Sequence, residues 1–305
     1  MKKNILKIIY WITGLLVLLF VVGELLEHAA LKVDPNEPKV QEVLSLKKQN
    51  YTALILGNSI TQQGINPTVL DSAVGTKSFN MAIGGASIFT MELLLRNYLL
   101  NNDKPEMIIY GLYVNEKEWP DKVRPTIVNN LNPLIVSEYY DTNEDAVGRG
   151  SMDFYNKFKA FRYRNAIEHY LKYIANSDLY TYSYKQGFLI RKTIAKPITD
   201  IPPNTAGLNF KALKRLEEFC KSQNIKLTLV ELPNHKVFNQ ATLNRDSILG
   251  ALRKQLRYDV DYIDLNKPEI YTEEEWASLN HLNLAGANKL SILIAEALKA
   301  RKPIE

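Results

Sequence analysis

The sequence predicts an α/β protein with a parallel sheet covered by helices on both faces, preceded by one transmembrane helix. Two observations predict the sheet. Five short apolar runs have the length of buried strands, and segments with helical spacing of apolar residues lie between them. Such alternation is typical of a parallel, helix-covered sheet. A third observation, an almost unbroken apolar stretch near the N-terminus, predicts the membrane helix.

The apolar stretch covers residues 5–22, which is about the length needed to cross a bilayer as a helix. Lysines at positions 2–3 precede it, and Glu24 and Glu27 follow it. This asymmetry favours a cytoplasmic N-terminus with the rest of the chain outside. A cleaved signal peptide is the alternative, but Glu27 would occupy the minus-three position for cleavage after Ala29, where a small residue is preferred. We therefore expect an uncleaved anchor.

The chain divides, on this basis, into a cytoplasmic tip and anchor at 1–30, a stalk at 31–50 and one large domain at 51–305. The stalk is polar and contains prolines. An irregular segment at 117–205 interrupts the strand and helix pattern and is predicted to be an insertion or cap. With 305 residues and 46% hydrophobic side chains, the chain can bury a substantial core.

Several classes of function lack support in the composition. The net charge of +5 is spread along the chain, and no basic block with interleaved aromatic residues indicates nucleic-acid binding. Cys220 is the only cysteine, so an intrachain disulfide is excluded. The four histidines lie far apart in sequence and have no metal-ligand spacing. We expect neither a metal site nor a cofactor.

The predicted strands and helices alternate along the chain. The strands are expected at 51–56, 78–82, 106–112, 225–232 and 260–264, and helices at 66–70, 87–100, 206–224, 238–257 and 284–299. Residues 61–64 are expected to form a loop. Within the insertion, 154–174 is predicted to form one basic, aromatic-rich amphipathic helix. It could pack on the domain as a cap, line a groove for a polyanionic or carbohydrate acceptor, or rest on anionic lipid.

A glycine and two small polar residues follow the first strand, in the order Gly57-Asn58-Ser59. Ligand sites of open α/β sheets lie at the carboxyl ends of the strands, which is where this turn places Ser59. The alternative is that Asn58 and Ser59 only cap the next helix. His281 precedes the final helix and could act as general base for a serine held at the same edge. Ser59 and His281 are thus the candidate catalytic pair.

Together these stretches resemble the SGNH (GDSL-like) hydrolase superfamily. The Ser59 block matches its Gly-Asp-Ser-Leu motif with Asn58 in the Asp position, and the likeness covers roughly 50–115 and 205–300. The resemblance implies a flavodoxin-like parallel sheet, the SGNH hydrolase fold. It also implies oxyanion donors. Gly85 is the better match to the family's glycine and Gly84 the alternative.

The third block of the family, Gly-x-Asn-Asp, is degraded here. Asn115 is in the position of the oxyanion-binding asparagine, but Tyr113 replaces the glycine, and a surface-loop asparagine is the competing interpretation. The fourth block departs as well, because the Asp that lies three residues before the family's histidine is Ser278 here. A displaced acid from Glu231 or from 273–275, or a backbone carbonyl, could orient the imidazole instead.

The anchor and the His-Leu-Asn-x-x-Gly-Ala stretch at 281–287 are most similar to the membrane-anchored extracytoplasmic proteins of alginate O-acetylation and teichoic-acid D-alanylation. The resemblance implies an acyltransferase or esterase that acts on a cell-surface or exported polysaccharide. It also implies an acylated donor, a carbohydrate or cell-envelope polymer as acceptor, and a multi-spanning membrane O-acyltransferase as partner. The expected location is the cell membrane, with a periplasmic or extracellular domain. A non-catalytic relative that binds carbohydrate or acts as a scaffold is the alternative.

Overall fold

The computed structural model describes residues 2–114, 125–142, 158–175, 177, 182–191, 198–256 and 260–300. The chain forms two compact units. The first comprises Met1–Gln41 and Arg124–Thr181, and the second comprises Glu42–Val123 and Tyr182–Glu305. The predicted insertion at 117–205 thus overlaps the stretch that belongs to the first unit. Its role as an insertion or cap, and that of 31–50 as a stalk, stay predictions.

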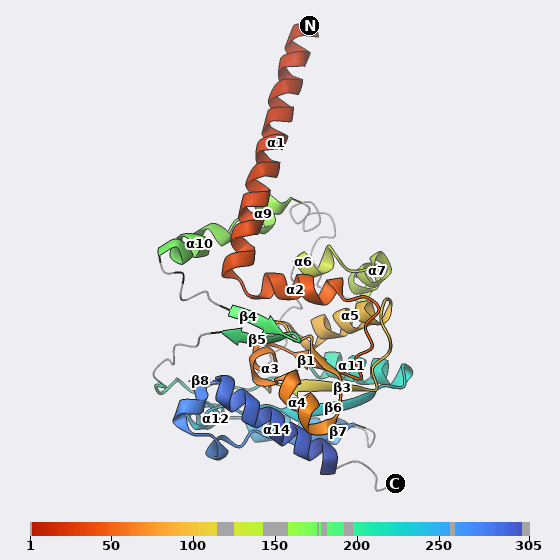
Figure 1. Ribbon diagram of the computed structural model, residues 1–305, viewed down its shortest axis with the longest axis vertical. Coiled ribbons are helices and arrows are strands. Elements are labelled where there is room, and N and C mark those ends of the chain that lie inside the picture. The colour runs from red at the N-terminus through yellow and green to blue at the C-terminus, as the bar shows by residue number, and fades with distance from the viewer. Residues whose placement is uncertain are drawn as a thin grey trace. The chain divides into compact units, whose positions relative to one another are not determined.

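A five-stranded parallel sheet forms the centre of the second unit (Figure 1). Its strands are β1 (Ala53–Gly57), β2 (Ser78–Asn80), β3 (Met107–Leu112), β6 (Lys226–Glu231) and β7 (Asp261–Asp264). They are ordered β2-β1-β3-β6-β7, and each neighbouring pair is parallel. This is the flavodoxin-like strand order, in which the chain reverses direction across the sheet between β1 and β3. The predicted fold class is confirmed.

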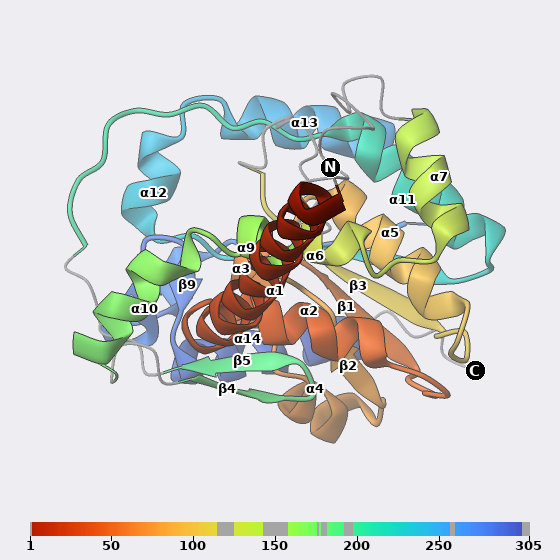
Figure 2. The ribbon, with the colours of Figure 1, turned by 90° about the horizontal axis from the view of Figure 1, so that it is seen from above.

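Helices cover both faces of the sheet, as expected for parallel strands that are buried on both sides (Figure 2). On one face, α3 (Ser59–Gly64) and α4 (Pro67–Val74) contact α14 (Leu284–Ala300). Alternate strand residues, Ile55, Ile109 and Val230 among them, join these helices in one buried cluster. On the other face, α5 (Ile88–Leu99) packs against α11 (Phe210–Ser222). The helices α12 (Lys236–Ala241) and α13 (Arg245–Gln255) connect β6 to β7.

Two antiparallel pairs supplement the main sheet. The hairpin of β4 (Tyr182–Lys185) and β5 (Phe188–Arg191) turns at Gln186 and Gly187, both of which have positive φ, at 49° and 76°. A two-residue turn of this kind suits the twist of a hairpin. The second pair is β8 (Trp276–Ser278) with β9 (His281–Leu282). Single 3-10 turns, η2 (Pro268–Ile270) and η3 (Glu273–Glu275), precede it.

The structure corrects two local predictions. Residues 61–64 were expected to form a loop, but they belong to α3, because Asn58 caps a helix that starts at Ser59. The predicted single helix at 154–174 is interrupted: its described part forms α9 (Lys159–Arg162) and α10 (Ala166–Ala175), with three non-helical residues between them. Residues 154–157, at the start of that prediction, lie outside the described part of the chain.

The first unit is built around α1 (Lys2–Val33), which is long and apolar enough over Asn4–Val33 to cross a membrane. Its C-terminal end packs against α9 and α10. Ala29 and Ala30 form a small buried cluster there with Tyr163 and Ala166. The unit also contains α6 (Pro125–Val128) and α7 (Pro133–Thr142), and the connecting helix α2 (Asn36–Ser45) begins in it.

Candidate active site

Ser59 is the first residue of α3 and directly follows the turn at the end of β1. The turn needs glycine, because Gly57 has φ of 150° and a Cβ there would lie 2.1 Å from Thr61 Oγ1. The Asn58 side chain accepts a hydrogen bond from the backbone N–H of Ile60 at 3.0 Å, which caps the helix. Ser59 is therefore held, half-buried, at the carboxyl edge of the sheet. Both interpretations of the Asn58-Ser59 pair fit this geometry.

His281 reaches this edge from the other end of the sequence. It lies in β9, just before α14, and its Nε2 is 3.0 Å from Ser59 Oγ. Asn283 fixes the start of α14, because its side chain accepts hydrogen bonds from the backbone N–H groups of Ala285 and Gly286. Gly286 lets the helix approach η3: a Cβ there would lie 2.7 Å from the Glu275 carbonyl oxygen. The structure thus brings the two predicted catalytic residues together.

Neutral oxygens contact the other ring nitrogen of His281. Nδ1 lies 2.8 Å from Asn280 Oδ1 and 3.1 Å from Ser278 Oγ. An amide oxygen can only accept, so the Asn280 contact places the ring proton on Nδ1 and the lone pair of Nε2 toward Ser59. Asn280 also makes a side-chain hydrogen bond with Tyr113, whose pKa is raised by burial and which therefore stays protonated.

Three of the four carboxylates considered as a displaced acid, Glu231, Glu273 and Glu275, have other partners. Glu273 contacts His235 Nε2 at 3.0 Å and Lys236 Nζ at 2.8 Å. Glu275 pairs with Lys289 at 3.1 Å and caps its own 3-10 turn. The interpretation of Asn280 as the orienting group was missed from the sequence, where only displaced acids and a backbone carbonyl were considered. An amide directly before the histidine was the available signal.

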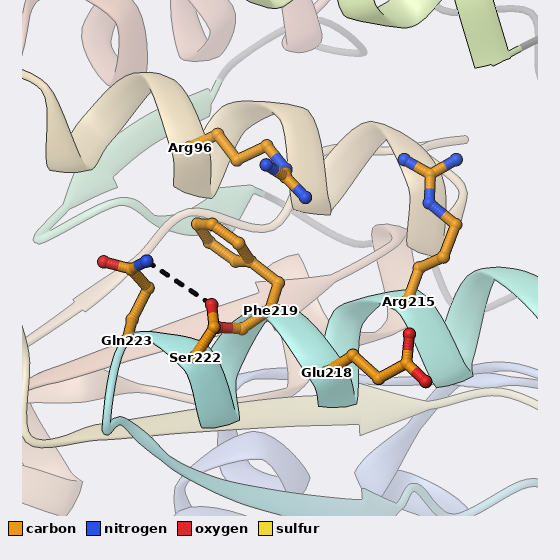
Figure 3. A pocket seen from close by; sticks show the side chains of 6 residues that line it. All are labelled: Arg96, Arg215, Glu218, Phe219, Ser222 and Gln223. Carbon is orange, nitrogen blue, oxygen red and sulfur yellow. Dashed lines mark hydrogen bonds between the residues drawn. The ribbon is translucent and has the colours of Figure 1, made fainter.

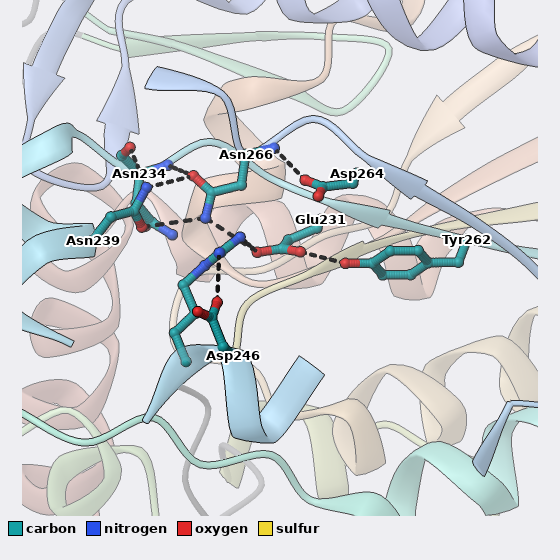
Figure 4. A network of polar contacts seen from close by, with 8 residues as sticks. Glu231, Asn234, Asn239, Asp246, Tyr262, Asp264 and Asn266 are labelled. Atoms are coloured by element: carbon teal, nitrogen blue, oxygen red, sulfur yellow. Dashed lines mark hydrogen bonds and ion pairs between the residues drawn. The ribbon is translucent and has the colours of Figure 1, made fainter. Parts of the chain in front are cut away.

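Glu231 belongs to a buried polar network rather than to the histidine (Figure 4). It is 1% exposed at the end of β6 and binds Arg245 and the hydroxyl of Tyr262. Asn266 Nδ2 donates a third hydrogen bond to it at 3.1 Å. Burial, followed by the charge of Glu231, raises the pKa of Tyr262, so its hydroxyl remains a donor. These contacts tie β6 to β7 and α13.

The described part of the chain includes some of the predicted oxyanion donors but not all of them. Gly85 follows β2 with φ of 73°, a conformation that favours glycine, and it is exposed, whereas Gly84 is buried. Asn80, at the end of β2, donates to the carbonyl oxygens of Thr61 and Ile65 at 3.0 and 2.9 Å, which fixes this strand end beside α3. Asn115 lies outside the described residues. The oxyanion roles of Gly85 and Asn115 stay predictions.

A surface cavity of about 330 Å³ lies between α5 and α11 and includes none of these residues (Figure 3). Arg96 and Arg215 line it, and both contact the buried carboxylate of Glu92, at 2.8 and 3.2 Å. Their guanidinium groups also lie over the rings of Phe219 and Phe89. These contacts show that the two arginines form ion pairs with Glu92 and pack on aromatic rings. Among the described residues, no cluster of three His, Cys, Asp or Glu side chains suits a metal ion.

Comparison with known proteins gives weak likenesses only. No protein-family model matches the chain, and no curated protein matches it in sequence. Among solved structures it is similar to a GDSL-like lipase of Bacteroides thetaiotaomicron, with 11% identity and a TM-score of 0.43 over 88% of this chain and 98% of that one.

Two further structures are similar at the same level. A candidate acylhydrolase of Bacteroides fragilis has 13% identity and a TM-score of 0.40, covering 87% of this chain and 95% of its own. An acetyl xylan esterase of Butyrivibrio proteoclasticus has 11% identity and a TM-score of 0.38, covering 84% of this chain and 65% of its own. At these scores, the function has to be argued from the chain's own residues.

Proposed function

We propose that this chain is an SGNH-type serine acyltransferase or esterase. The observation that carries the proposal is the 3.0 Å contact between Ser59 Oγ and His281 Nε2, made by residues 222 positions apart at the carboxyl edge of the sheet. A serine in hydrogen-bond contact with an imidazole, whose other nitrogen is held by a third group, is the arrangement of an activated nucleophile.

The reaction has two halves. In the first, Ser59 Oγ attacks the carbonyl carbon of an acyl donor while its proton passes to His281 Nε2. The tetrahedral intermediate then expels the donor's alcohol, which takes that proton, and leaves an ester on Ser59. In the second, water or an acceptor hydroxyl gives its proton to Nε2 and attacks the ester carbonyl; Ser59 Oγ then leaves and takes that proton back, which releases the acid or the acylated acceptor. The backbone N–H groups of Ser59 and Gly85 and the Asn115 amide are the proposed oxyanion donors, each worth about 3–4 kcal/mol.

The helix α1 supports a proposal for the position of the chain in the membrane. The helix is proposed as one uncleaved span, with the lysines at 2–3 in the cytoplasm and the catalytic unit in the periplasm or outside the cell. An anchored domain favours substrates held in or on the cell envelope. Together with the motif resemblance, this supports a cell-surface or exported polysaccharide as acceptor. It also supports a multi-spanning membrane O-acyltransferase as supplier of the acyl group.

The nucleophile can be tested directly. The detergent-solubilised full-length chain is incubated with a fluorophosphonate probe, and the adduct is mapped by mass spectrometry. We expect labelling at Ser59 that is abolished by Ser59→Ala and reduced at least about 10²-fold by His281→Ala. Ser72→Ala and His169→Ala, at exposed positions of α4 and α10, are the matched controls. Absence of labelling in all forms would contradict an enzyme and favour the non-catalytic carbohydrate-binding alternative.

Transferase and esterase share the acyl-enzyme and differ in the acceptor. With a p-nitrophenyl ester as donor, a transferase would pass the acyl group to an oligosaccharide hydroxyl in preference to water. Release of p-nitrophenol without any acylated oligosaccharide would make the chain a tethered esterase. The neutral groups at Nδ1 of His281 make slow turnover the expectation in either case, since the loss of an orienting carboxylate costs up to about 10⁴-fold elsewhere.

A further inference from the structure

The helix α10 has a stripe of exposed apolar side chains. Ile167, Leu171 and Ile174 are 55%, 61% and 66% exposed. Their spacings of four and three residues place them on one side of the helix. Apolar side chains arranged in this way gain free energy when an apolar medium covers them. Single exposed apolar residues are ordinary, but an aligned stripe on a helix with a charged opposite side indicates an interaction surface.

The stripe is distinct from the side of α10 that packs on α1. Ala166 is buried against Ala29 and Ala30 of α1, and Tyr170 packs against the same cluster. Since each helical residue is rotated by about 100° from the last, Ile167 and Leu171 lie about a quarter-turn from that contact. The apolar arc of α10 is thus wider than the part that α1 covers.

The contact between α1 and α10 determines at which point along α1, and so at which depth relative to the bilayer, α10 lies. The exposed apolar part of α1 runs from Ile5 to Leu25, which is about 31 Å at 1.5 Å per residue and matches a bilayer core of about 30 Å. Contact with α9 starts inside this stretch, at Gly23, where a Cβ would lie 2.9 Å from Lys159 Cβ. The α10 contact lies further on: Ala166 packs with Ala29 and Ala30, and Ala29 is four residues past Leu25, or about 6 Å beyond the core. The headgroup layer on each side of the core is about 5–8 Å thick, so α10 lies at its depth.

The charges near this level suit an anionic surface. Lys159 of α9 lies 2.8 Å from Glu24 and 2.6 Å from Glu27, so its charge offsets one of the two acidic charges of α1 closest to the bilayer. Hydrogen bonds to these two carboxylates raise the pKa of Lys159, which keeps it charged. Residues 158–175 contain four basic side chains and one acidic, Glu168; with Glu24 and Glu27 of α1 counted at the same level, an excess of one positive charge remains. Basic residues at this depth attract anionic headgroups.

We propose that α10 is an interfacial helix, with Ile167, Leu171 and Ile174 inserted at the boundary between headgroups and acyl chains of the membrane that α1 spans. The basic residues of 158–175, most of which lie in α9 and the turn after it, contact anionic lipid headgroups. The helix then resists rotation of the first unit about the α1 axis, because turning α1 would withdraw the stripe from the bilayer. The proposal rests on α1 as a membrane span and is independent of the chemistry at Ser59.

Depth-dependent quenching tests the insertion. The full-length Leu171→Cys chain is labelled with the environment-sensitive dye NBD and reconstituted in vesicles of phosphatidylcholine, with and without phosphatidylglycerol. The matched control is Lys172→Cys, one residue further on the polar side. We expect blue-shifted emission and quenching by lipids brominated near the headgroup for position 171, and emission typical of water for 172. Equal, water-like emission at both positions would overturn the proposal, and would leave a protein partner as the occupant of the stripe.

A second measurement needs no dye. In the wild-type chain, backbone amides of α10 are expected to exchange hydrogen at least tenfold more slowly in phosphatidylglycerol-containing vesicles than in detergent. Replacing Ile167, Leu171 and Ile174 together by Ser should remove this difference, and the fold should tolerate the change since all three are exposed. Equal protection in the wild type and the triple variant would overturn insertion. Equal protection with and without phosphatidylglycerol would overturn the preference for anionic lipid.

Discussion

The side-chain oxygen of Asn280 lies 2.8 Å from Nδ1 of His281, the residue that follows it in the chain. An amide in this place fixes the tautomer of the imidazole, as a carboxylate would, but it supplies no negative charge for the imidazolium that forms during reaction. Orientation and charge stabilisation, which one Asp provides in the resembled family, are therefore separated here. Each can be tested by its own substitution.

Orientation is tested at Asn280. Asn280→Ala removes the acceptor for Nδ1–H and leaves Ser278 Oγ, at 3.1 Å, as the remaining contact. We expect kcat for a p-nitrophenyl ester to fall at least about tenfold, but by less than the roughly 10⁴-fold that a wrong tautomer costs. The matched control is Asn283→Ala, which disturbs the start of α14 without touching the ring. Equal losses in both variants would show that Asn280 acts only through local folding.

Charge stabilisation is tested at Ser278, the position of the family's Asp. Ser278→Asp brings a carboxylate next to Nδ1, where it favours the imidazolium. We expect kcat to rise about tenfold or more, and the rise of the rate with pH to move to higher pH, because the protonated ring is then stabilised. Ser278→Asn has the same size without charge and should leave the rate near that of wild type. A slower Ser278→Asp enzyme would contradict this account.

The sequence predicted the features that depend on local periodicity. The five strands are apolar because both faces of the sheet are buried, and the turn at Gly57 and the histidine before the last helix are visible without a structure. The orienting group was not predictable in this way. Whether Asn280, Ser278 or a distant carboxylate faces Nδ1 depends on the path of the β8–β9 turn, which periodicity does not determine.

Two other differences between the expectations from the sequence and the structure have physical causes. The helix α3 was taken for a loop because Thr61, Gln62 and Gln63 are polar, yet all three are buried against the sheet and α14. The candidate acid Glu231 ends a strand, as a catalytic acid would, but its contacts with Arg245 and Tyr262 depend on how α13 and β7 pack beside it, which periodicity does not determine. A polar strand end has the same appearance in sequence whether it serves structure or catalysis.

The close packing of Thr61 against Gly111, below the Ser59 turn, leads to a prediction about the free energy of unfolding. A Cβ at Gly111 would lie 2.1 Å from Thr61 Oγ1 and 2.9 Å from Leu232 Cδ1. Gly111→Ala should therefore destabilise the fold by about 1–3 kcal/mol, as overpacking does elsewhere. Thr61→Ala removes the Thr61 atoms that would clash, together with its 3.3 Å hydrogen bond to the Gly111 carbonyl, and leaves the milder contact with Leu232.

The double variant should consequently lose less stability than the sum of the two single variants, as measured by urea unfolding. Strict additivity would mean that Thr61 is not what limits space at position 111.

The buried pair of Glu231 and Arg245 allows a test of whether Glu231 has a structural or a catalytic role. Glu231→Gln leaves Arg245, whose side chain is only 20% exposed, without its charge partner. Breaking such a pair costs about 3 kcal/mol or more. We expect a lower Tm with little change in kcat per folded molecule. Asp246→Asn, which removes an exposed carboxylate 3.7 Å from the same arginine, should have little effect on either. A selective loss of kcat in Glu231→Gln would instead make Glu231 the missing acid.

Cys220 should be chemically silent in the folded chain. It is 1% exposed, and burial, with a smaller effect of the Glu92 charge, raises the pKa of its thiol to about 12. At pH 8 only about one molecule in 10⁴ carries the reactive thiolate, so maleimide should label the thiol only after unfolding. Ser222→Cys, exposed near the end of the same helix, is the control and should react within minutes. Rapid labelling of the wild type would contradict the packing of α11.

A silent native thiol also allows the orientation of α1 to be measured in intact cells. A membrane-impermeant maleimide should label Lys47→Cys, at an exposed position after α2, and should label Asn4→Cys only after the cells are lysed. This expectation follows from the basic residues at 2–3 before the apolar stretch and from Glu24 and Glu27 after it, an asymmetry that favours a cytoplasmic N-terminus. The reverse labelling pattern, or a mature protein that starts near residue 30, would contradict the single uncleaved span.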